Sequence, residues 1–404
     1  MRIALVVTEY ITETNFDGGL ANYTYRIALS LSQSGHEPVV FVEADQNQRF
    51  IHDGIEVNRV KYRRVFWLSV LNVLTWRRMK RFFNYLRQSW NLNACLKRRH
   101  RLAPFALVQY THLSGTGFFR PKNIPAVIRL SSYTPLWFQF GEYTDRSRFQ
   151  VWQQTVMENW ALKRMDAVFG PCKMVAAVVQ KQLEIPVQIL ESPFVIPDAP
   201  EDTSLLQNQL FGKQYLLFFG RLNRPKGVLV IAAIIKKLLQ MHPDLSYVFI
   251  GRETTGFEGH PMMEHLYNQA GKYRDRVRYL GRVPQCQLFP IIRNAVAVTL
   301  PALIENFPNT CLEAMAFGQV VVATRDTGFD QLISHGKSGL MCRADDPADF
   351  LETVEIALQM SRVEREVMGR FARSRLESLK PEMVASRHLE FYRNVIEQIE
   401  NKND

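Results

Sequence analysis

The sequence lacks several features that mark particular classes of protein. Its 404 residues contain no apolar run long enough to cross a bilayer, since the longest, Val65 to Trp76, is interrupted by polar residues. The N-terminal apolar run has neither the longer core nor the cleavage site of a secretory signal peptide. The five cysteines are scattered without a C-x-x-C pair, which is typical of reduced, buried thiols. These absences predict a cytosolic protein rather than a membrane-spanning or disulfide-stabilised secreted one.

Acidic residues are missing from one long stretch. Between Val57 and Gly141 there is no Asp or Glu, but there are 16 Lys and Arg residues. Residues 1–198 hold 25 basic and 15 acidic side chains, whereas residues 199–404 hold 25 and 24. We therefore expect a cationic N-terminal half that attracts phosphates, acidic glycans, anionic lipid or nucleic acid. Nucleic acid is the least favoured of these partners because no DNA- or RNA-binding motif accompanies the charge.

The apolar residues alternate between strand-like and helix-like patterns. Residues 2–7 form a buried strand pattern, followed by a glycine-bearing loop, a helical pattern and a second strand at residues 38–42. This order predicts a parallel sheet. Three prolines interrupt the alternation between Ser192 and Glu201, after which it restarts. The sequence thus predicts two α/β domains, 1–198 and 199–380, and a final helix at 381–404 that crosses back to the first domain.

The most specific motif contains two glutamates, Glu305 and Glu313, on either side of a predicted strand-to-helix turn. The amides at the start of this helix, around Asn309 and Thr310, carry the positive end of the helix dipole, which is a natural site for a phosphate. Two isolated glutamates with this spacing are more often surface acids that complement the dipole. The surrounding residues decide between these interpretations.

This region resembles the C-terminal domain of the retaining family 4 glycosyltransferases. Within residues 297–343, the two glutamates match the family's Glu-x7-Glu motif, and the later Gly-x-x-Gly-Leu matches residues 336–340. The family's Gly-Arg and Lys-Gly pairs match residues 220–221 and 226–227, and its N-terminal glycine loop matches residues 18–19. The resemblance implies the GT-B fold, an α/β architecture in which two Rossmann-like, doubly wound domains face each other across a cleft.

The resemblance also implies roles for the matched residues. Glu313 would bind the nucleotide ribose, and Glu305 would face the hydroxyls of the transferred sugar. Arg221 and Lys226 would bind the donor pyrophosphate and stabilise it as a leaving group. Because the sequence contains no Asp-x-Asp motif, we expect neither a metal ion nor another cofactor at this site.

Weaker candidates lie in the N-terminal half. Gly18 and Gly19 would let the backbone approach the donor's phosphate or sugar, although such a pair is more often a plain turn. His112 follows a predicted strand and is a candidate to assist near the reacting sugar; the alternative is a hydrogen-bonded structural histidine. The chain departs from the family pattern at Ser131, where many members carry a histidine, and at Pro308, where a glycine is common.

The acid-free stretch contains a candidate membrane-binding segment at about residues 61–101. From Trp76 to Trp90, apolar residues recur at spacings of three and four, and basic residues fill much of the remainder. This pattern is typical of helices that lie on anionic membranes, and it is equally typical of a core-packed helix with a solvated basic face. We expect a cytoplasmic protein and leave open its peripheral attachment to the inner face of a membrane.

Together these observations predict a retaining glycosyltransferase that moves a hexose from a UDP- or GDP-sugar to a hydroxyl of a glycan, glycolipid or lipid-linked acceptor. In the front-face mechanism that the family implies, the departing phosphate takes the proton of the attacking hydroxyl. The expected setting is the assembly of cell-surface glycans. Two alternatives stay open: a GT-B protein with another reaction, such as sugar epimerisation, and a non-catalytic module that binds membranes or polyanions.

Overall fold

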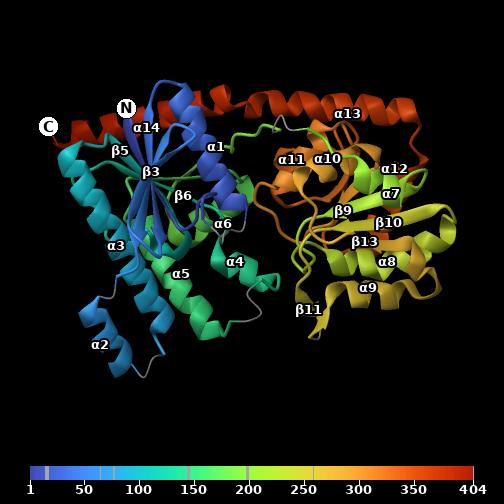
Figure 1. Ribbon diagram of the computed structural model, residues 1–404, viewed down its shortest axis with the longest axis horizontal. Helices are drawn as coiled ribbons and strands as arrows, with labels where there is room; N and C mark the ends of the chain where they lie inside the picture. The colour runs from blue at the N-terminus through green and yellow to red at the C-terminus, as the bar shows by residue number, and fades with distance from the viewer. Residues whose placement is uncertain are drawn as a thin grey trace. The chain divides into compact units, whose positions relative to one another are not determined.

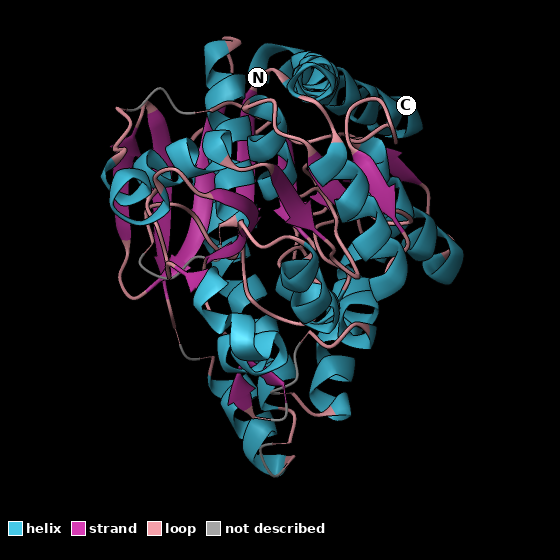
Figure 2. Cartoon of the chain, turned by 90° about the vertical axis from the view of Figure 1, so that its right-hand side faces the viewer, coloured by secondary structure: helices cyan, strands magenta, loops and turns pink. Residues whose placement is uncertain are grey.

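The computed structural model describes residues 1–13, 18–63, 65–75, 78–142, 146–196, 200–257 and 259–403. The chain forms two compact units (Figure 1). Unit 1 comprises Met1–Phe138, Asp145–Phe194 and Leu379–Asp404, and unit 2 comprises Gln139–Thr144 and Val195–Ser378. In both units helices flank the strands (Figure 2).

Unit 1 is built on an eight-stranded sheet with the order β3-β4-β2-β1-β5-β6-β7-β8. All neighbouring strands are parallel except β3 and β4, which form an antiparallel edge hairpin that the sequence patterns do not predict. The strands are β1 (Arg2–Val7), β2 (Glu37–Ala44), β3 (Gln48–His52), β4 (Ile55–Lys61), β5 (Leu107–Thr111), β6 (Ala126–Arg129), β7 (Ala167–Gly170) and β8 (Val187–Ile189). The central strands are buried on both faces, as continuous apolar runs in parallel sheets are.

The helices of unit 1 are α1 (Gly19–Gln33), α2 (Phe66–Leu74), α3 (Lys80–Leu102), α4 (Thr134–Gln139), α5 (Arg148–Lys163), α6 (Lys173–Leu183) and α14 (Pro381–Asn403), with a 3-10 turn η1 at Leu113–Gly115. The basic helix predicted from Trp76 begins at Lys80 in the structure. A separate helix, α2, precedes it and ends at Leu74. Residues 76 and 77 lie outside the described residues. No helix among the described residues is long and apolar enough to cross a membrane.

Unit 2 is built on a six-stranded, fully parallel sheet with the order β13-β10-β9-β14-β15-β16. Its strands are β9 (Gln214–Phe219), β10 (Leu245–Ile250), β13 (Val277–Tyr279), β14 (Ala297–Leu300), β15 (Val321–Thr324) and β16 (Leu340–Cys342), and a separate small hairpin joins β11 (Thr255–Phe257) to β12 (His260–Pro261). The helices are α7 (Ser204–Leu210), α8 (Val228–Met241), α9 (Met262–Ala270), α10 (Gln285–Asn294), α11 (Asn309–Ala316), α12 (Pro347–Gln359) and α13 (Arg362–Leu376), with 3-10 turns η2 (Gly271–Arg276), η3 (Gly328–Gln331) and η4 (Glu377–Leu379). The two predicted parallel-sheet units are therefore confirmed.

The C-terminal helix α14 belongs to the core of unit 1. Its buried Tyr392 and Val395 lie in one apolar cluster with Leu5 of β1 and Ile27 of α1. The Tyr392 hydroxyl also donates a hydrogen bond to the side-chain oxygen of Gln109, which lies on the central strand β5. The last residues of the chain thus complete a core whose first strand is formed by the first residues.

We expect Tyr392→Ala to lower the free energy of unfolding of unit 1 by about 3–5 kcal/mol, because it leaves a cavity and an unpaired buried amide. All six tryptophans of the sequence lie within residues 1–138 and 145–194. Urea unfolding followed by tryptophan fluorescence therefore reports on unit 1. The neighbouring exposed Arg393→Ala serves as the control and should change stability by less than ~0.5 kcal/mol. Equal effects of the two substitutions would show that α14 is not part of this core.

Candidate functional site

The predicted site residues of unit 2 lie at one edge of its sheet. Arg221 and Lys226 lie in the loop between β9 and α8, and Glu305 lies in the loop between β14 and α11. Strands β9 and β14 are parallel neighbours, so both loops leave the carboxyl edge of the sheet. This is the edge at which open α/β sheets bind ligands.

An ion pair joins the two loops. The Lys226 ammonium contacts the Glu305 carboxylate directly. Glu305 is largely buried, and Lys226 is about one-third exposed. The backbone oxygen of Glu305 also accepts a hydrogen bond from the Gly328 amide at an N···O distance of 3.0 Å. A Cβ atom at Gly328 would lie 1.9 Å from the backbone oxygen of Asn306, so only glycine lets these segments approach so closely.

The second cation is held by a glutamate that sequence reasoning missed. Arg221 Nη1 lies 3.1 Å from Oε1 of Glu142, and Asn223 Nδ2 donates to Oε2 of the same carboxylate at 3.4 Å. Asn223 in turn accepts a hydrogen bond from the Lys226 amide at 3.1 Å. Glu142 thereby links Arg221 to the loop that carries Lys226. Its one sequence signal is that it is the first acidic residue after the acid-free stretch.

The amino end of α11 lies against the end of β9. A Cβ atom at Gly220 would lie 3.8 Å from the methyl group of Thr310, in the first turn of α11 beside Asn309. Pro308 occupies the N-cap position and makes no side-chain cap. Glu313 is half-buried and lies one turn further along the same helix. The structure thus places the positive end of a helix dipole next to the strand that leads to Arg221.

The glycine pair of unit 1 precedes α1. Gly18 has a φ of +86°, a conformation that favours glycine, and its carbonyl accepts the hydrogen bond from Asn22 at 3.0 Å. Gly19 is exposed, and a Cβ atom there would meet nothing within 4 Å. Backbone conformation explains Gly18, whereas packing within unit 1 does not require Gly19.

His112 is completely buried at the end of β5. Its Nδ1 accepts a hydrogen bond from the Ser131 amide at 3.0 Å, and its Nε2 lies 2.7 Å from the Ser132 carbonyl, to which it donates in the tautomer that this network assigns. Burial lowers the pKa of His112 to about 4, so the ring is neutral at pH 7. Both ring nitrogens are engaged by backbone, which favours the structural alternative over a catalytic role for His112.

A buried carboxyl group lies beside this histidine. Glu158 of α5 accepts hydrogen bonds from Thr134 (2.9 Å) and Gln154 (2.7 Å), and its Oε2 lies 4.0 Å from His112 Nε2. Burial raises the pKa of Glu158 to about 7. A carboxyl group that is partly protonated at neutral pH therefore lies beside His112 in unit 1. No pattern around Glu158 in the sequence distinguishes it from a surface acid.

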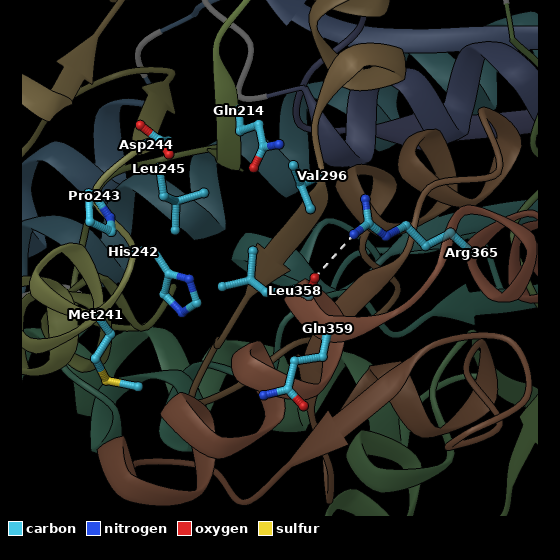
Figure 3. Close-up of a pocket in the computed structure, with 10 residues that line it drawn as sticks. All are labelled: Gln214, Met241, His242, Pro243, Asp244, Leu245, Val296, Leu358, Gln359 and Arg365. Carbon is cyan, nitrogen blue, oxygen red and sulfur yellow. Dashed lines mark hydrogen bonds between the residues drawn. The ribbon is translucent and has the colours of Figure 1, made fainter.

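A cavity of about 450 Å³ opens at the opposite, amino edge of the unit 2 sheet (Figure 3). Gln214 and Leu245 begin β9 and β10, and Val296 immediately precedes β14. The ten residues that line it are Gln214, Met241, His242, Pro243, Asp244, Leu245, Val296, Leu358, Gln359 and Arg365. In the view of Figure 3, Arg365 reaches toward Leu358, to whose carbonyl it donates a hydrogen bond at 3.2 Å. The cavity is separate from the charged site, because the two lie at opposite ends of the same strands.

The structure thus brings together Arg221, Lys226, Glu305 and the start of α11 in unit 2. Gly18, Gly19 and His112 lie in unit 1. Among the described residues, no three His, Cys, Asp or Glu side chains are arranged to hold a metal ion. The chemistry that this site offers is the binding of an anion by two cations and a helix terminus, next to a carboxylate that can accept hydrogen bonds from hydroxyls.

Comparison with known proteins matches two glycosyltransferase family models, one in each half of the chain. Residues 18–188 match the family described as "Glycosyl transferase 4-like domain", and residues 213–360 match that described as "Glycosyl transferases group 1". A D-inositol 3-phosphate glycosyltransferase of Corynebacterium urealyticum is 31% identical over 181 residues, which are 44% of this chain and 42% of that protein. A lipopolysaccharide core biosynthesis mannosyltransferase of Rhizobium leguminosarum is 28% identical over 199 residues, which are 48% and 54%. The chain thus spans about half the length of these relatives.

Solved structures match over nearly the whole chain. Sucrose-phosphate synthase from Thermosynechococcus elongatus superposes with a TM-score of 0.76 at 16% identity, covering 98% of this chain and 100% of that one. The Anabaena protein HepE, solved in complex with UDP and glucose, superposes with a TM-score of 0.67 at 16% identity, covering 98% and 100%. At this level of identity the likeness establishes the fold of the chain.

We expect Gly227→Ala to destabilise unit 2 by about 3 kcal/mol more than Gly212→Ala. Both glycines have similar positive φ angles, +75° and +71°. A Cβ atom at Gly227 would lie 1.7 Å from the Pro301 carbonyl oxygen, whereas one at Gly212 would meet nothing within 4 Å. Differential scanning calorimetry of the two variants measures the difference. Equal melting temperatures would mean that the loop after Lys226 is not held against β14.

The Glu158→Gln variant tests the buried carboxyl group. A carboxyl whose pKa is raised by folding, here from 4.5 to about 7, contributes stability below pH 4.5 that is lost as the pH rises through 7. Relative to wild type, Glu158→Gln should therefore be more stable at pH 8 than at pH 5 by ~2–3 kcal/mol.

Urea unfolding of unit 1, followed by tryptophan fluorescence at both pH values, measures this change. Glu184→Gln, at an exposed position of the same unit, is the control and should show no such dependence. A pH-independent effect of Glu158→Gln would contradict a protonated Glu158.

Proposed function

Because the chain belongs to the group 1, family 4-like glycosyltransferases and has their GT-B fold, we propose that it transfers a hexose from a UDP- or GDP-sugar to a hydroxyl of an acceptor. The observation that carries this proposal is the charged edge of unit 2. There Arg221 is held by Glu142, Lys226 is paired with Glu305, and α11 begins beside them. The nucleotide and sugar bound in the related structure of HepE support a donor of this class.

Arg221 and Lys226 bind the pyrophosphate of the donor. Two cations and the amide end of a helix match the charge of a diphosphate, and charge-assisted hydrogen bonds to phosphate are the stronger class. Lys226 is neutralised by Glu305 in the structure. When the diphosphate binds, Lys226 gains a second anionic partner, and Glu305 turns its remaining oxygen to the hydroxyls of the sugar.

Glu313 and the first turn of α11 complete the donor site. The two oxygens of the Glu313 carboxylate accept hydrogen bonds from the two vicinal hydroxyls of the ribose. The amides of Asn309 and Thr310 face the phosphates, with which the dipole of α11 interacts favourably. In unit 1, the conformation of Gly18 before α1 leaves its backbone open to the close approach of a phosphate or sugar, without a Cβ atom in the way.

The reaction proceeds without a metal and with retained configuration. The acceptor hydroxyl attacks the anomeric carbon from the side of the leaving group, so that the new C–O bond forms on the face where the bond to phosphate breaks. The proton of the hydroxyl passes to the departing phosphate oxygen. Arg221, Lys226 and the helix dipole stabilise the negative charge that develops on the diphosphate. No protein nucleophile is required.

The acceptor is a glycan, a glycolipid or a lipid-linked sugar that binds unit 1. The cationic composition of residues 1–198 supports an acceptor that carries phosphate or lies at an anionic surface. Two of the relatives are named for inositol 3-phosphate and for the lipopolysaccharide core. We place the enzyme in the cytoplasm, at the inner face of a membrane where cell-surface glycans are assembled.

Differential scanning calorimetry at increasing concentrations of UDP, GDP or ADP, in the presence of EDTA, tests the donor site. One nucleotide at 100 times its dissociation constant should stabilise the wild-type protein by about 2.7 kcal/mol. Arg221→Gln should weaken this nucleotide about 10- to 100-fold, because it removes a charge-assisted contact. Glu313→Ala should abolish nucleotide binding.

The matched control is Arg362→Gln, which removes an exposed arginine of α13. It should leave nucleotide affinity unchanged. If Arg221→Gln and Arg362→Gln bind the nucleotide with equal affinity, the donor site does not lie at Arg221. If no nucleotide stabilises the wild-type protein, the chain is a binding module. If a UDP- or GDP-sugar is converted to its epimer without an acceptor and without net release of nucleotide, the chain catalyses another reaction, epimerisation.

A further inference from the structure

Unit 1 carries an apolar helix whose outer face its own fold does not cover. Helix α2 has the sequence Phe-Trp-Leu-Ser-Val-Leu-Asn-Val-Leu, and Figure 1 shows it at the end of unit 1 next to the start of α3. Leu68 faces inward, buried in a small cluster with Leu86 of α3 and Met157 of α5. The outward residues include Phe66 and Leu74, which are 82% and 68% exposed. One face of α2 therefore anchors the helix, and the other presents apolar side chains to solvent.

A continuous band of aromatic rings extends this apolar face. Trp67 of α2 makes an edge contact with Trp90 of α3 at a centroid distance of 6.5 Å, and Trp90 contacts Phe119 at 5.2 Å. Phe118, next to Phe119, contacts Trp160 of α5 at 5.6 Å. The three tryptophans are each nearly half exposed. These contacts join α2, α3 and α5 into one aromatic surface.

Basic residues lie next to α2 and at the start of α3 in the sequence. Arg63, Arg78 and Lys80 are exposed, and within the part of the chain that the structure describes none of them pairs with a carboxylate. The sequence offers no acidic residue from Val57 to Gly141. Exposed cations near exposed apolar groups are complementary to a lipid bilayer, which is anionic at its headgroups and apolar beneath them.

We propose that α2, together with Trp90 and Trp160, inserts into the interfacial region of an anionic lipid bilayer while Arg63, Arg78 and Lys80 contact the lipid headgroups. At nine residues, α2 is about 13 Å long, which suits a helix lying in the interface. Tryptophan rings favour this depth because they have an apolar body and a polar N–H. A contiguous exposed apolar patch with polar residues at its rim is typical of a site that binds another molecule or a membrane.

The surface that would hold the protein at the proposed membrane location is not the basic helix expected from Trp76 to Trp90. The anchoring element is the apolar helix α2. Helix α3 supplies Trp90 and, at its first position, the cation Lys80. The inference rests on unit 1 alone, because vesicle binding requires no donor and no residue of the charged edge of unit 2. Its failure and the failure of the proposed reaction are therefore measured separately.

Co-sedimentation with vesicles tests the apolar face. We expect the wild-type protein to bind vesicles of phosphatidylglycerol and phosphatidylcholine, and the triple variant Phe66→Asp, Val73→Asp, Leu74→Asp to bind them at least ~100-fold more weakly, because three apolar insertions are lost. The matched control is Phe211→Asp with Val363→Asp, two equally exposed apolar residues of unit 2. The control should bind vesicles as the wild type does.

The flanking charges give a second, independent measurement. Arg78→Gln with Lys80→Gln should weaken binding to anionic vesicles about 25-fold at low salt, from about fivefold for each charge, and should leave binding to pure phosphatidylcholine unchanged. Arg362→Gln with Arg370→Gln, two exposed cations of α13, should have no effect. Wild-type tryptophan emission should shift to shorter wavelength on anionic vesicles, and Trp67→Phe should reduce this shift.

Three results would overturn the proposal. The first is that the wild-type protein fails to bind anionic vesicles, and the second is that the α2 triple variant binds them as well as the wild type does. The third is that the protein dimerises in sedimentation velocity and loses only this property in the triple variant, since the face would then serve a second copy of the chain. An unchanged urea unfolding transition of unit 1, followed by tryptophan fluorescence, shows that the triple variant is folded.

Discussion

The ion pair between Lys226 and Glu305 is the contact on which the candidate site depends. It joins the loops that leave two neighbouring parallel strands, β9 and β14, and it places both charges at the carboxyl edge of the unit 2 sheet. Two close approaches hold these loops, since Gly227 packs on Pro301 and Gly328 packs on Asn306. A buried carboxylate and its partner ammonium thus lie together at the edge where we propose that the donor binds.

The two units contribute different electrostatics. Unit 2 holds its charged site by pairing, as Glu142 holds Arg221 and Glu305 holds Lys226. In unit 1, Arg63, Arg78 and Lys80 are instead exposed near the apolar helix α2, whereas other cations of the acid-free stretch, such as Arg87 and Arg99, pair with glutamates of the same unit. Pairing keeps side chains in one geometry, which suits the recognition of a defined donor. Unpaired cations beside apolar surface suit a broad, anionic surface, for which no single geometry is needed.

Burial is the main influence on the titration of two neighbouring groups of unit 1, His112 and Glu158. It lowers the pKa of His112 and raises the pKa of Glu158, because in each case it disfavours the charged form. His112 is thus neutral near pH 7 and Glu158 is partly protonated, and the two act as hydrogen-bonding partners of the backbone and of Thr134 and Gln154. These hydrogen bonds order the polypeptide next to the end of β5.

The sequence by itself determined what local patterns encode. Alternating apolar segments predicted the parallel sheets and the start of α11, because strand, turn and helix signals lie within a few residues. The resemblance of short motifs to the family 4 glycosyltransferases singled out Arg221, Lys226 and Glu305. Only the tertiary structure decided which side chains meet. Glu142 reaches Arg221 across 79 positions of sequence, both nitrogens of His112 bind backbone on the neighbouring strand's loop, and α2 keeps its apolar face uncovered. Such outcomes depend on long-range packing, which no short stretch of sequence contains.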